Sequence, residues 1–154
     1  MQGNEEIIKR LNARLSEELT AINQYMVHSE MCDNWGYELL HKEIEKRAID
    51  EMKHAEKIIG RILFLEGIPV VSSYNKLYIG STVEAMHKND RIAEEGAIRS
   101  YNDDIKYAAE VQDNGTKDLL QSILDEEEAH IDKLEEYLDQ IEQMGIQIYL
   151  STYK

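Results

Sequence analysis

Two copies of the pattern Glu-x-x-His occur in this sequence, and each lies on the apolar stripe of a predicted helix. Glu51 and His54 are three residues apart, as are Glu127 and His130. On a helix this spacing places a carboxylate and an imidazole on the same face. Most residues before and after each pair at helical intervals are isoleucine, leucine or alanine. A fold of this chain must therefore accommodate carboxylates and imidazoles within a helical core.

The two halves of the chain repeat with a constant offset of 76 residues, so that Glu18 corresponds to Glu94 (94 − 18 = 76). Both of these glutamates lie on apolar stripes, and the same offset takes the first Glu-x-x-His pair to the second. A helical hairpin repeated in this way is predicted to bury its stripe against its twin, so that six polar residues converge from four helices. The apolar positions that match under this offset are Ala21 with Ala97, Ile22 with Ile98, Tyr25 with Tyr101, Ile44 with Leu120, Ile58 with Leu134, Ile62 with Leu138, and Leu65 with Ile141.

The breaks between predicted helices are few, because only one proline and eight glycines occur in 154 residues. Gly67 and Pro69 are expected to end the second helix. The segment Ser81–Glu84 has the pattern of a capping box that opens the third helix. The segment Asn114-Gly115-Thr116 is expected to separate the third helix from the fourth.

Periodicity predicts four long helices followed by a short one. A long connection between the second and third helices predicts an all-α, ferritin-like four-helix bundle rather than a simple up-and-down bundle. We expect residues 1–154 to form one domain. The predicted segments are helices over about 5–34 and 37–66, an extended crossover over 68–81, a third helix after it, a fourth helix over about 116–144 and a short fifth one within 146–150.

Composition excludes several kinds of partner. A net charge of −14 argues against binding to nucleic acid or to an anionic membrane, and it suits a protein that collects cations. No apolar run reaches transmembrane length, and the polar N-terminus does not resemble a signal peptide. The one cysteine, Cys32, has no partner for an internal disulfide. We therefore expect a cytoplasmic protein.

Four carboxylates buried together are destabilising unless they are protonated, paired or bound to metal. Two divalent cations would balance their charge, and two imidazoles would complete the ligand set. The expected arrangement places Glu18 and His54 on one ion, Glu94 and His130 on the other, and Glu51 and Glu127 between them. Such ligands suit iron or manganese and do not exclude zinc. The alternative is a hydrated core in which these six side chains reach solvent.

These six residues, together with the motifs quoted at the end of this paragraph, make the whole chain resemble bacterioferritin. The resemblance implies that Glu18, Glu51, His54, Glu94, Glu127 and His130 form a ferroxidase centre that binds two iron ions per subunit. It also implies oxidation of Fe(II) by dioxygen or peroxide, and storage of a ferric mineral within a shell of 24 identical subunits built from two-fold dimers. The motifs that carry it are Ala21-Ile22-Asn23-Gln24-Tyr25, Asp50-Glu51-Met52-Lys53-His54-Ala55, Ile62-Leu63-Phe64-Leu65-Glu66-Gly67, Asp125-Glu126-Glu127 and Gln143-Met144-Gly145.

The resemblance also assigns a haem-binding role to the predicted second helix, which carries Glu51 and His54. Met52 follows Glu51, so it points about 100° away from the metal face. In bacterioferritins the matching methionine is an axial ligand of haem b, which two subunits share across a two-fold axis. The resemblance therefore implies haem at Met52, iron release aided by this haem and a possible ferredoxin electron donor. It also favours Tyr25 as the tyrosine that hydrogen-bonds a ligand carboxylate.

Some positions depart from the family pattern. Lys46 stands where some members have a histidine that forms an inner iron site with Asp50, and Lys133 stands where some have tryptophan. For this reason we expect neither that site nor an electron path through a tryptophan. His28, His41 and His87 are expected on the surface, Trp35 is expected to pack at the first turn, Cys32 is expected to be half-buried, and the apolar segment after Gly145 is expected to be exposed in a monomer.

Two other functions compete with iron storage. A peroxide-reducing di-iron protein similar to rubrerythrin would have the same ligands, but this chain lacks the Cys-x-x-Cys module that usually supplies its electrons. The other candidate is a bundle that binds metal or haem without catalysis. Particle size separates these functions, because only a large shell can contain a mineral.

Overall fold

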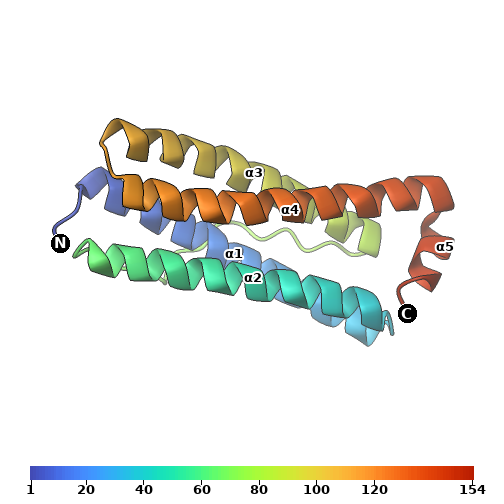
Figure 1. The fold of residues 1–154 in the computed structure, drawn as a ribbon. Coiled ribbons are helices and arrows are strands. Elements are labelled where there is room, and N and C mark those ends of the chain that lie inside the picture. The colour runs from blue at the N-terminus through green and yellow to red at the C-terminus, as the bar shows by residue number, and fades with distance from the viewer.

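The computed structural model describes residues 1–154 and contains five helices and no strands. The predicted all-α, ferritin-like bundle with a short fifth helix is confirmed (Figure 1). None of the helices combines the length and apolar character that a membrane span requires. The helices are α1 (Glu5–Asn34), α2 (Glu38–Phe64), α3 (Val83–Glu110), α4 (Asn114–Met144) and α5 (Ile146–Ser151).

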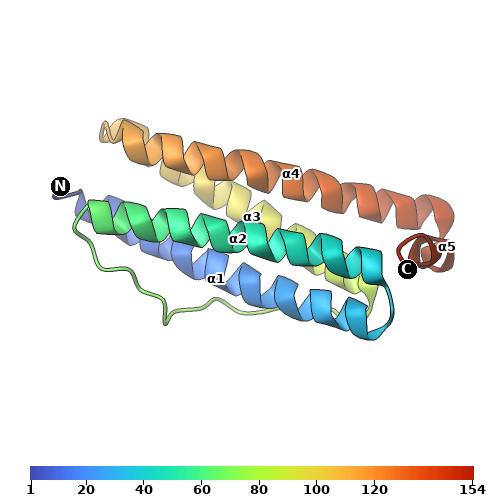
Figure 2. The same cartoon turned by 60° about the horizontal axis from the view of Figure 1, so that its bottom comes forward.

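The four long helices form two hairpins, in which α1 packs mainly against α2 and α3 against α4. Residues 65–82 form the predicted crossover, which contains no helix and runs along the length of the bundle beside α1 (Figure 2). This crossover returns the chain to the opposite end of the bundle, so α2 and α3 run in the same direction. The repeat is visible in the helix boundaries, since the offset that takes Glu18 to Glu94 also takes the end of α1 to the end of α3 and the start of α2 to the start of α4.

Two predicted helix ends were wrong in detail. The N-cap of α3 is Thr82, not Ser81, because the Thr82 side chain accepts a hydrogen bond from the Ala85 backbone N–H at 3.2 Å. At the end of α2, the left-handed residue is Glu66, with φ of 62°, and not Gly67. Glycine is needed at position 67 for space instead, since an added Cβ there would lie 2.7 Å from the Ile8 side chain.

The second hairpin turn also differs from the prediction. Asn114 and Gly115 belong to α4, which begins two residues earlier than expected and is capped by the Asp113 side chain. The left-handed residue of this turn is Gln112, with φ of 61°, and it matches Gly36 of the first turn, whose φ is 83°. A glutamine gives no turn signal in sequence, whereas a glycine does.

The core consists of two apolar clusters with a polar layer between them. One cluster lies toward the end of the bundle where the chain begins and includes Leu11, Ile58 and Ile123. The other lies toward α5 and includes Ile44, Leu134 and Tyr137. The six polar residues of the repeated stripes lie between these clusters, where a bundle without a ligand would have apolar side chains.

Two of the three histidines outside the repeat were predicted incorrectly. His28 and His87 are fully buried rather than on the surface. His41, also expected on the surface, is partly exposed; its Nδ1 contacts Ser29 and its Nε2 lies 3.7 Å from a Glu45 oxygen. His41 also forms a partly exposed group with Glu30 and Glu45, in which one atom of each side chain lies within 4.8 Å of the others.

The thiol and the C-terminal segment are more buried than predicted. Cys32 is fully buried, not half-buried. The segment after Gly145 forms α5, which lies across the end of the bundle (Figure 1). Tyr149 of α5 is buried and hydrogen-bonded to His87 at 2.9 Å, so only part of this apolar segment, including Ile148, faces solvent.

A buried polar network attaches the crossover to the bundle. The Asp90 carboxylate lies 2.6 Å from Arg47 Nη2 and 3.0 Å from His28 Nδ1, and it accepts a hydrogen bond from Gln24 at 2.8 Å. His28 Nε2 accepts from the backbone N–H of Gly80, so the ring proton lies on Nδ1 and is donated to Asp90. One carboxylate thereby orients the side chains that hold the crossover in place.

Candidate metal centre

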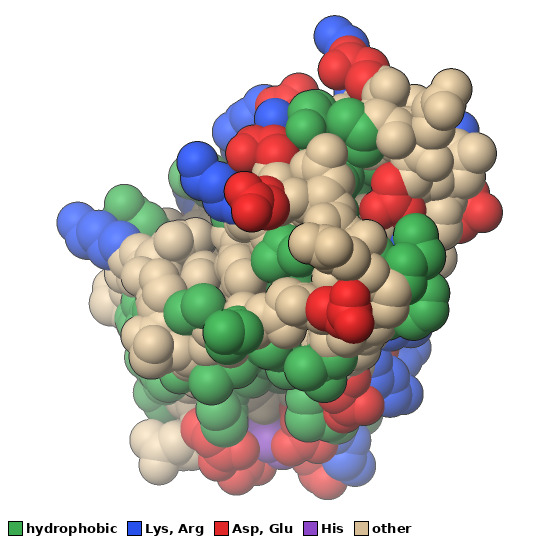
Figure 3. All heavy atoms as spheres, turned by 90° about the vertical axis from the view of Figure 1, so that its left-hand side faces the viewer, with side chains coloured by type: hydrophobic (Ala, Val, Ile, Leu, Met, Phe, Trp, Pro, Cys, Tyr) green, Lys and Arg blue, Asp and Glu red, His purple; other side chains and the backbone are tan.

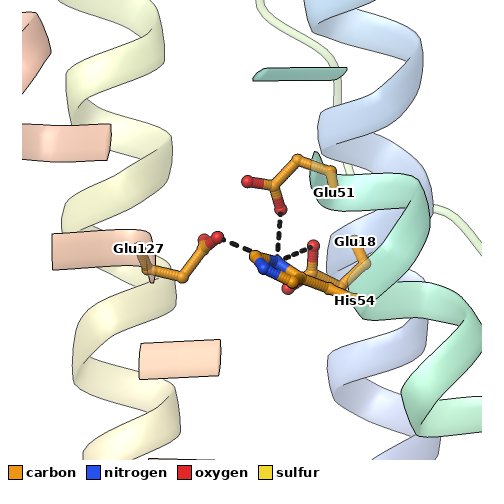
Figure 4. A group of neighbouring side chains, drawn as sticks. All are labelled: Glu18, Glu51, His54 and Glu127. Carbon is orange, nitrogen blue, oxygen red and sulfur yellow. Dashed lines mark ion pairs between the residues drawn. The ribbon is translucent and has the colours of Figure 1, made fainter. Parts of the chain in front are cut away.

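The structure brings together all six polar residues of the repeated stripes at the middle of the bundle. Glu18 comes from α1 and Glu94 from α3, while each Glu-x-x-His pair comes from α2 or α4. Each of the six residues is at most 9% exposed, so this is not a hydrated core open to solvent. Figure 4 shows the His54 ring between the carboxylates of Glu18, Glu51 and Glu127, which reach it from three helices.

The six side chains form two groups of four that share Glu51 and Glu127. In the first group, His54 Nδ1 lies 3.1 Å from a Glu127 oxygen and 3.5 Å from oxygens of Glu18 and Glu51. In the second, His130 Nδ1 lies 2.9 Å from a Glu51 oxygen and 3.4 Å from oxygens of Glu94 and Glu127. Within each group the possible ligand atoms all lie within 4.8 Å of one another.

Every member of the cluster has a buried polar atom that makes no hydrogen bond. Such atoms are rare in folded proteins, because the loss of hydration is not compensated. Here all six belong to one site and are of the types that bind divalent metal. They are Glu18 Oε2, Glu51 Oε1, His54 Nδ1, Glu94 Oε2, Glu127 Oε1 and His130 Nδ1. The donor set and its unsatisfied atoms therefore fit two cations.

The cluster contains four buried carboxylates and only two imidazoles, and this excess of acidic groups shifts the pKa values of its members. Burial raises the pKa of Glu51 well above its usual value, and that of Glu94 to about 8, with Glu127 adding repulsion to both. Burial alone would lower the pKa of His130, but contacts with Glu127 and Glu94 outweigh it and raise the value to about 10. Without metal, the cluster therefore retains protons that two divalent cations would displace.

A carboxylate outside the cluster orients each histidine. His130 Nε2 lies 3.1 Å from an Asp50 oxygen on α2, and His54 Nε2 contacts Glu126 on α4. Because a carboxylate accepts, each Nε2 carries the proton and each Nδ1 lone pair faces the cluster in the neutral ring. The sequence did not lead us to expect this role for either carboxylate, although the offset of the repeat also takes Asp50 to Glu126 and could have pointed to it.

Two tyrosines hold the outer carboxylates across the bundle. The Tyr25 hydroxyl donates to a Glu94 oxygen, and the Tyr101 hydroxyl donates to a Glu18 oxygen. Tyr25 thus makes the contact that the resemblance implies, and Tyr101 makes the equivalent one. Each bond leaves the other oxygen of its glutamate free for a cation.

The centre lies between two cavities. One of about 430 Å³ is bounded by α1, α3 and the crossover, and its lining includes all four cluster glutamates. The other, of about 390 Å³, lies on the side of α2 and α4 and is lined by His130 and Asp50 with Lys46 and Lys133. Asp50 contacts His130 directly, and Lys46 adds a positive charge to that cavity.

Met52 lies away from the metal centre and is 45% exposed, although Glu51 beside it is buried. Ile49, one turn earlier on α2, is also exposed. This part of α2 therefore presents an apolar thioether surface that nothing in the single chain covers. Exposed apolar side chains also occur where α2 ends, among them Leu63, Phe64 and Ile68, and Figure 3 shows apolar side chains among acidic ones on the face at this end.

Comparison with known proteins finds relatives along nearly the whole chain. Residues 8–144 match the family model of the ferritin-like domain. A bacterioferritin of Mycolicibacterium paratuberculosis is 40% identical over 149 residues, which are 97% of this chain and 94% of the relative. Bacterioferritin BfrA of Mycobacterium tuberculosis is 39% identical over 149 residues, with the same coverage. A bacterioferritin of Streptomyces coelicolor is 41% identical over 155 residues, which are 99% of this chain and 91% of the relative.

Proposed function

This chain belongs to the bacterioferritin family of ferritin-like proteins, and we propose that it stores iron by oxidising Fe(II) at the buried carboxylate–histidine centre. The observation that carries the proposal is the set of six unsatisfied ligand atoms, contributed by four helices and grouped as two sites that share Glu51 and Glu127. In this function Fe(II) is the substrate, and the ferric product is the stored material.

Each half of the internal repeat provides a glutamate and a histidine for one of the two ions. Glu18 and His54 bind one Fe(II), Glu94 and His130 bind the other, and Glu51 and Glu127 lie between the ions. Binding displaces the protons that the metal-free cluster retains. The two ions together give up two electrons, which reduce dioxygen to hydrogen peroxide with uptake of two protons, or peroxide to two waters with uptake of two protons.

Charge explains why the product leaves the centre. Two Fe(II) ions balance the four glutamates, whereas two Fe(III) ions leave an excess of two positive charges in a buried site. Such an excess is strongly unfavourable at low dielectric, and it favours release with hydrolysis of the ferric ions. The cavity beside His130 offers an outlet on the side of α2 and α4.

Storage requires a container, and we propose that the chain assembles into a cytoplasmic shell of 24 subunits built from two-fold dimers. The exposed apolar side chains of α2 support association, because such surfaces are normally covered. The exposed Met52 would hold haem b together with its copy in a second subunit, because a two-fold axis brings two copies of one residue together. Haem would supply electron transfer, with a ferredoxin as the proposed donor for iron release.

Fe(II) added aerobically to the metal-free protein is expected to give ferric absorbance faster than buffer alone. The iron should co-elute with a large particle on size-exclusion chromatography, because a monomer or dimer cannot enclose a mineral. A small particle that consumes peroxide without retaining iron would contradict storage and would favour the function similar to rubrerythrin. Iron binding without oxidation would favour a non-catalytic bundle.

Met52→Leu is expected to abolish haem binding while leaving Fe(II) oxidation close to wild type, because leucine preserves the apolar surface but has no thioether sulfur. Haem-reconstituted wild-type protein should contain about one haem per two subunits by pyridine haemochrome assay, as one residue and its symmetry copy supply both ligands. Met144→Leu, at the exposed end of α4, is the matched control. Full haem content in Met52→Leu would show that another residue ligates the iron.

A further inference from the structure

Glu17 is a carboxylate beside the metal centre that the proposed ligand set does not use. It precedes Glu18 on α1 and lines the same cavity of about 430 Å³ as the four cluster glutamates. Its Oε2 accepts from Arg14 Nη1 at 3.1 Å, while its Oε1 is buried and has no hydrogen-bond partner. The side chain is 24% exposed, so it lies between the surface and the buried cluster.

The rim of this cavity is built from the crossover and is attached to α1. The backbone N–H of Asn75 donates to Thr20 Oγ1 at 2.8 Å, and that of Tyr78 donates to Gln24 Oε1 at 3.0 Å. Thr20 and Gln24 are both buried. The extended crossover is therefore held at a defined position over the cavity, although it contains no secondary structure.

Lys76 lies on this rim between the two attached residues. Its Nζ is 5.2 Å from the centre of the Tyr78 ring, and Lys76 is one of the residues that line the cavity. Because no ion pair holds this ammonium group, its charge acts on the cavity without a carboxylate partner. The cavity thus has a positive charge at its rim and five glutamates deeper inside, one of which is Glu17.

We propose that divalent iron reaches the centre through this cavity, that Glu17 binds each ion transiently on the way, and that Lys76 slows its passage. The unpartnered Oε1 gives a partly dehydrated cation a ligand before it reaches the paired sites. The rim lysine opposes the same cation by repulsion, so the two residues set the rate of uptake in opposite directions. Neither residue is needed to hold metal at equilibrium.

This inference rests on the proposed function, so its test measures metal uptake without oxidation. Stopped-flow absorbance follows Co(II) binding to the assembled metal-free protein, because Co(II) held by carboxylates and imidazoles absorbs visible light. Uptake is expected to be about threefold or more slower in Glu17→Gln and about twofold or more faster in Lys76→Gln, within the range known for electrostatic steering. Both variants should still bind two Co(II) per chain.

The matched controls are Glu84→Gln and Lys88→Gln, which break an exposed ion pair on α3 outside the cavity and should leave the rate unchanged. Higher ionic strength should reduce the differences between the variants, because salt screens the charges. Unchanged uptake in both cavity variants overturns the inference and leaves the proposed function intact. Loss of one Co(II) per chain in Glu17→Gln would make Glu17 a resident ligand and would also overturn it. Failure of wild-type protein to bind Co(II) would contradict the centre itself.

Discussion

Replacing both Glu51 and Glu127 by alanine is expected to reduce Fe(II) oxidation to the rate of autoxidation in buffer. These two glutamates belong to both groups of ligand atoms, so their loss damages both sites at once. The decrease should exceed the roughly 10–100-fold effect of removing a residue that only orients a metal ligand. Stopped-flow absorbance of the ferric product measures it under single-turnover conditions.

The control for this double variant replaces Glu56 and Glu128, which lie on the same two helices but are exposed. That protein should oxidise Fe(II) at the wild-type rate. In the metal-free state, the Glu51 and Glu127 variant should also unfold at a higher temperature than wild type, because removal of two buried carboxylates leaves two glutamates opposite two imidazoles. Rapid oxidation that persists in the double variant would place the reaction elsewhere.

Arg47→Met is expected to lower the free energy of unfolding by about 3–5 kcal/mol, the usual effect of removing one partner of a buried ion pair. Arg47 and Asp90 are both buried, and methionine would leave the Asp90 carboxylate with only His28 and Gln24 as donors. Thermal unfolding at one protein concentration measures the change, since assembly also stabilises the chain. Lys42→Met removes an exposed pair with Glu38 and should change the stability by less than about 1 kcal/mol.

The effect of Arg47→Met should depend on pH in one direction. Burial would raise the pKa of Asp90, but Arg47 and His28 outweigh it and hold the value below its usual range. The carboxylate therefore contributes stability above its unfolded-state pKa of about 4, and this contribution disappears as pH falls through the lower folded-state pKa. The difference between variant and wild type should be largest near neutral pH and decrease on acidification. A difference that stays constant as pH falls from about 5 to about 2 would contradict this account of Asp90, because the contribution should be lost in that range.

The internal repeat makes the position of the metal centre predictable from the sequence. One offset relates Glu18 to Glu94 and one Glu-x-x-His pair to the other, and helical periodicity places them on inward faces. Position along the helix placed Glu18 and Glu51 at a similar level, but it placed Glu94 about one turn farther from its break than Glu127, because the second break was predicted later in the chain than it lies. Because a helix has a fixed rise and turn, such local rules are sufficient for residues on regular elements.

Contacts across the bundle were less predictable. Neither the burial of His28 and His87 nor the pairing of Arg47 with Asp90 follows from one helix alone. The rim of the cavity could not be predicted either, because residues 70–80 show no periodicity that would indicate which part of the bundle they pack against. Gly80 is an example: the crossover passes so close to α3 there that an added Cβ would lie 2.4 Å from the Met86 backbone nitrogen, and this contact exists only in the folded structure.

The sequence by itself therefore determined the four long helices, their crossover and the six polar residues that face one another, because periodicity and internal repetition are properties of the chain. Only the tertiary structure decided which atoms of those residues remain unsatisfied and which carboxylates orient the two histidines. It also decided that Glu17 and Lys76 share a cavity with the centre. The reason is that hydrogen bonds and cavities depend on distances between segments that are remote in the chain, and the positions of Asp90, Glu126 and the crossover are fixed only when the hairpins pack.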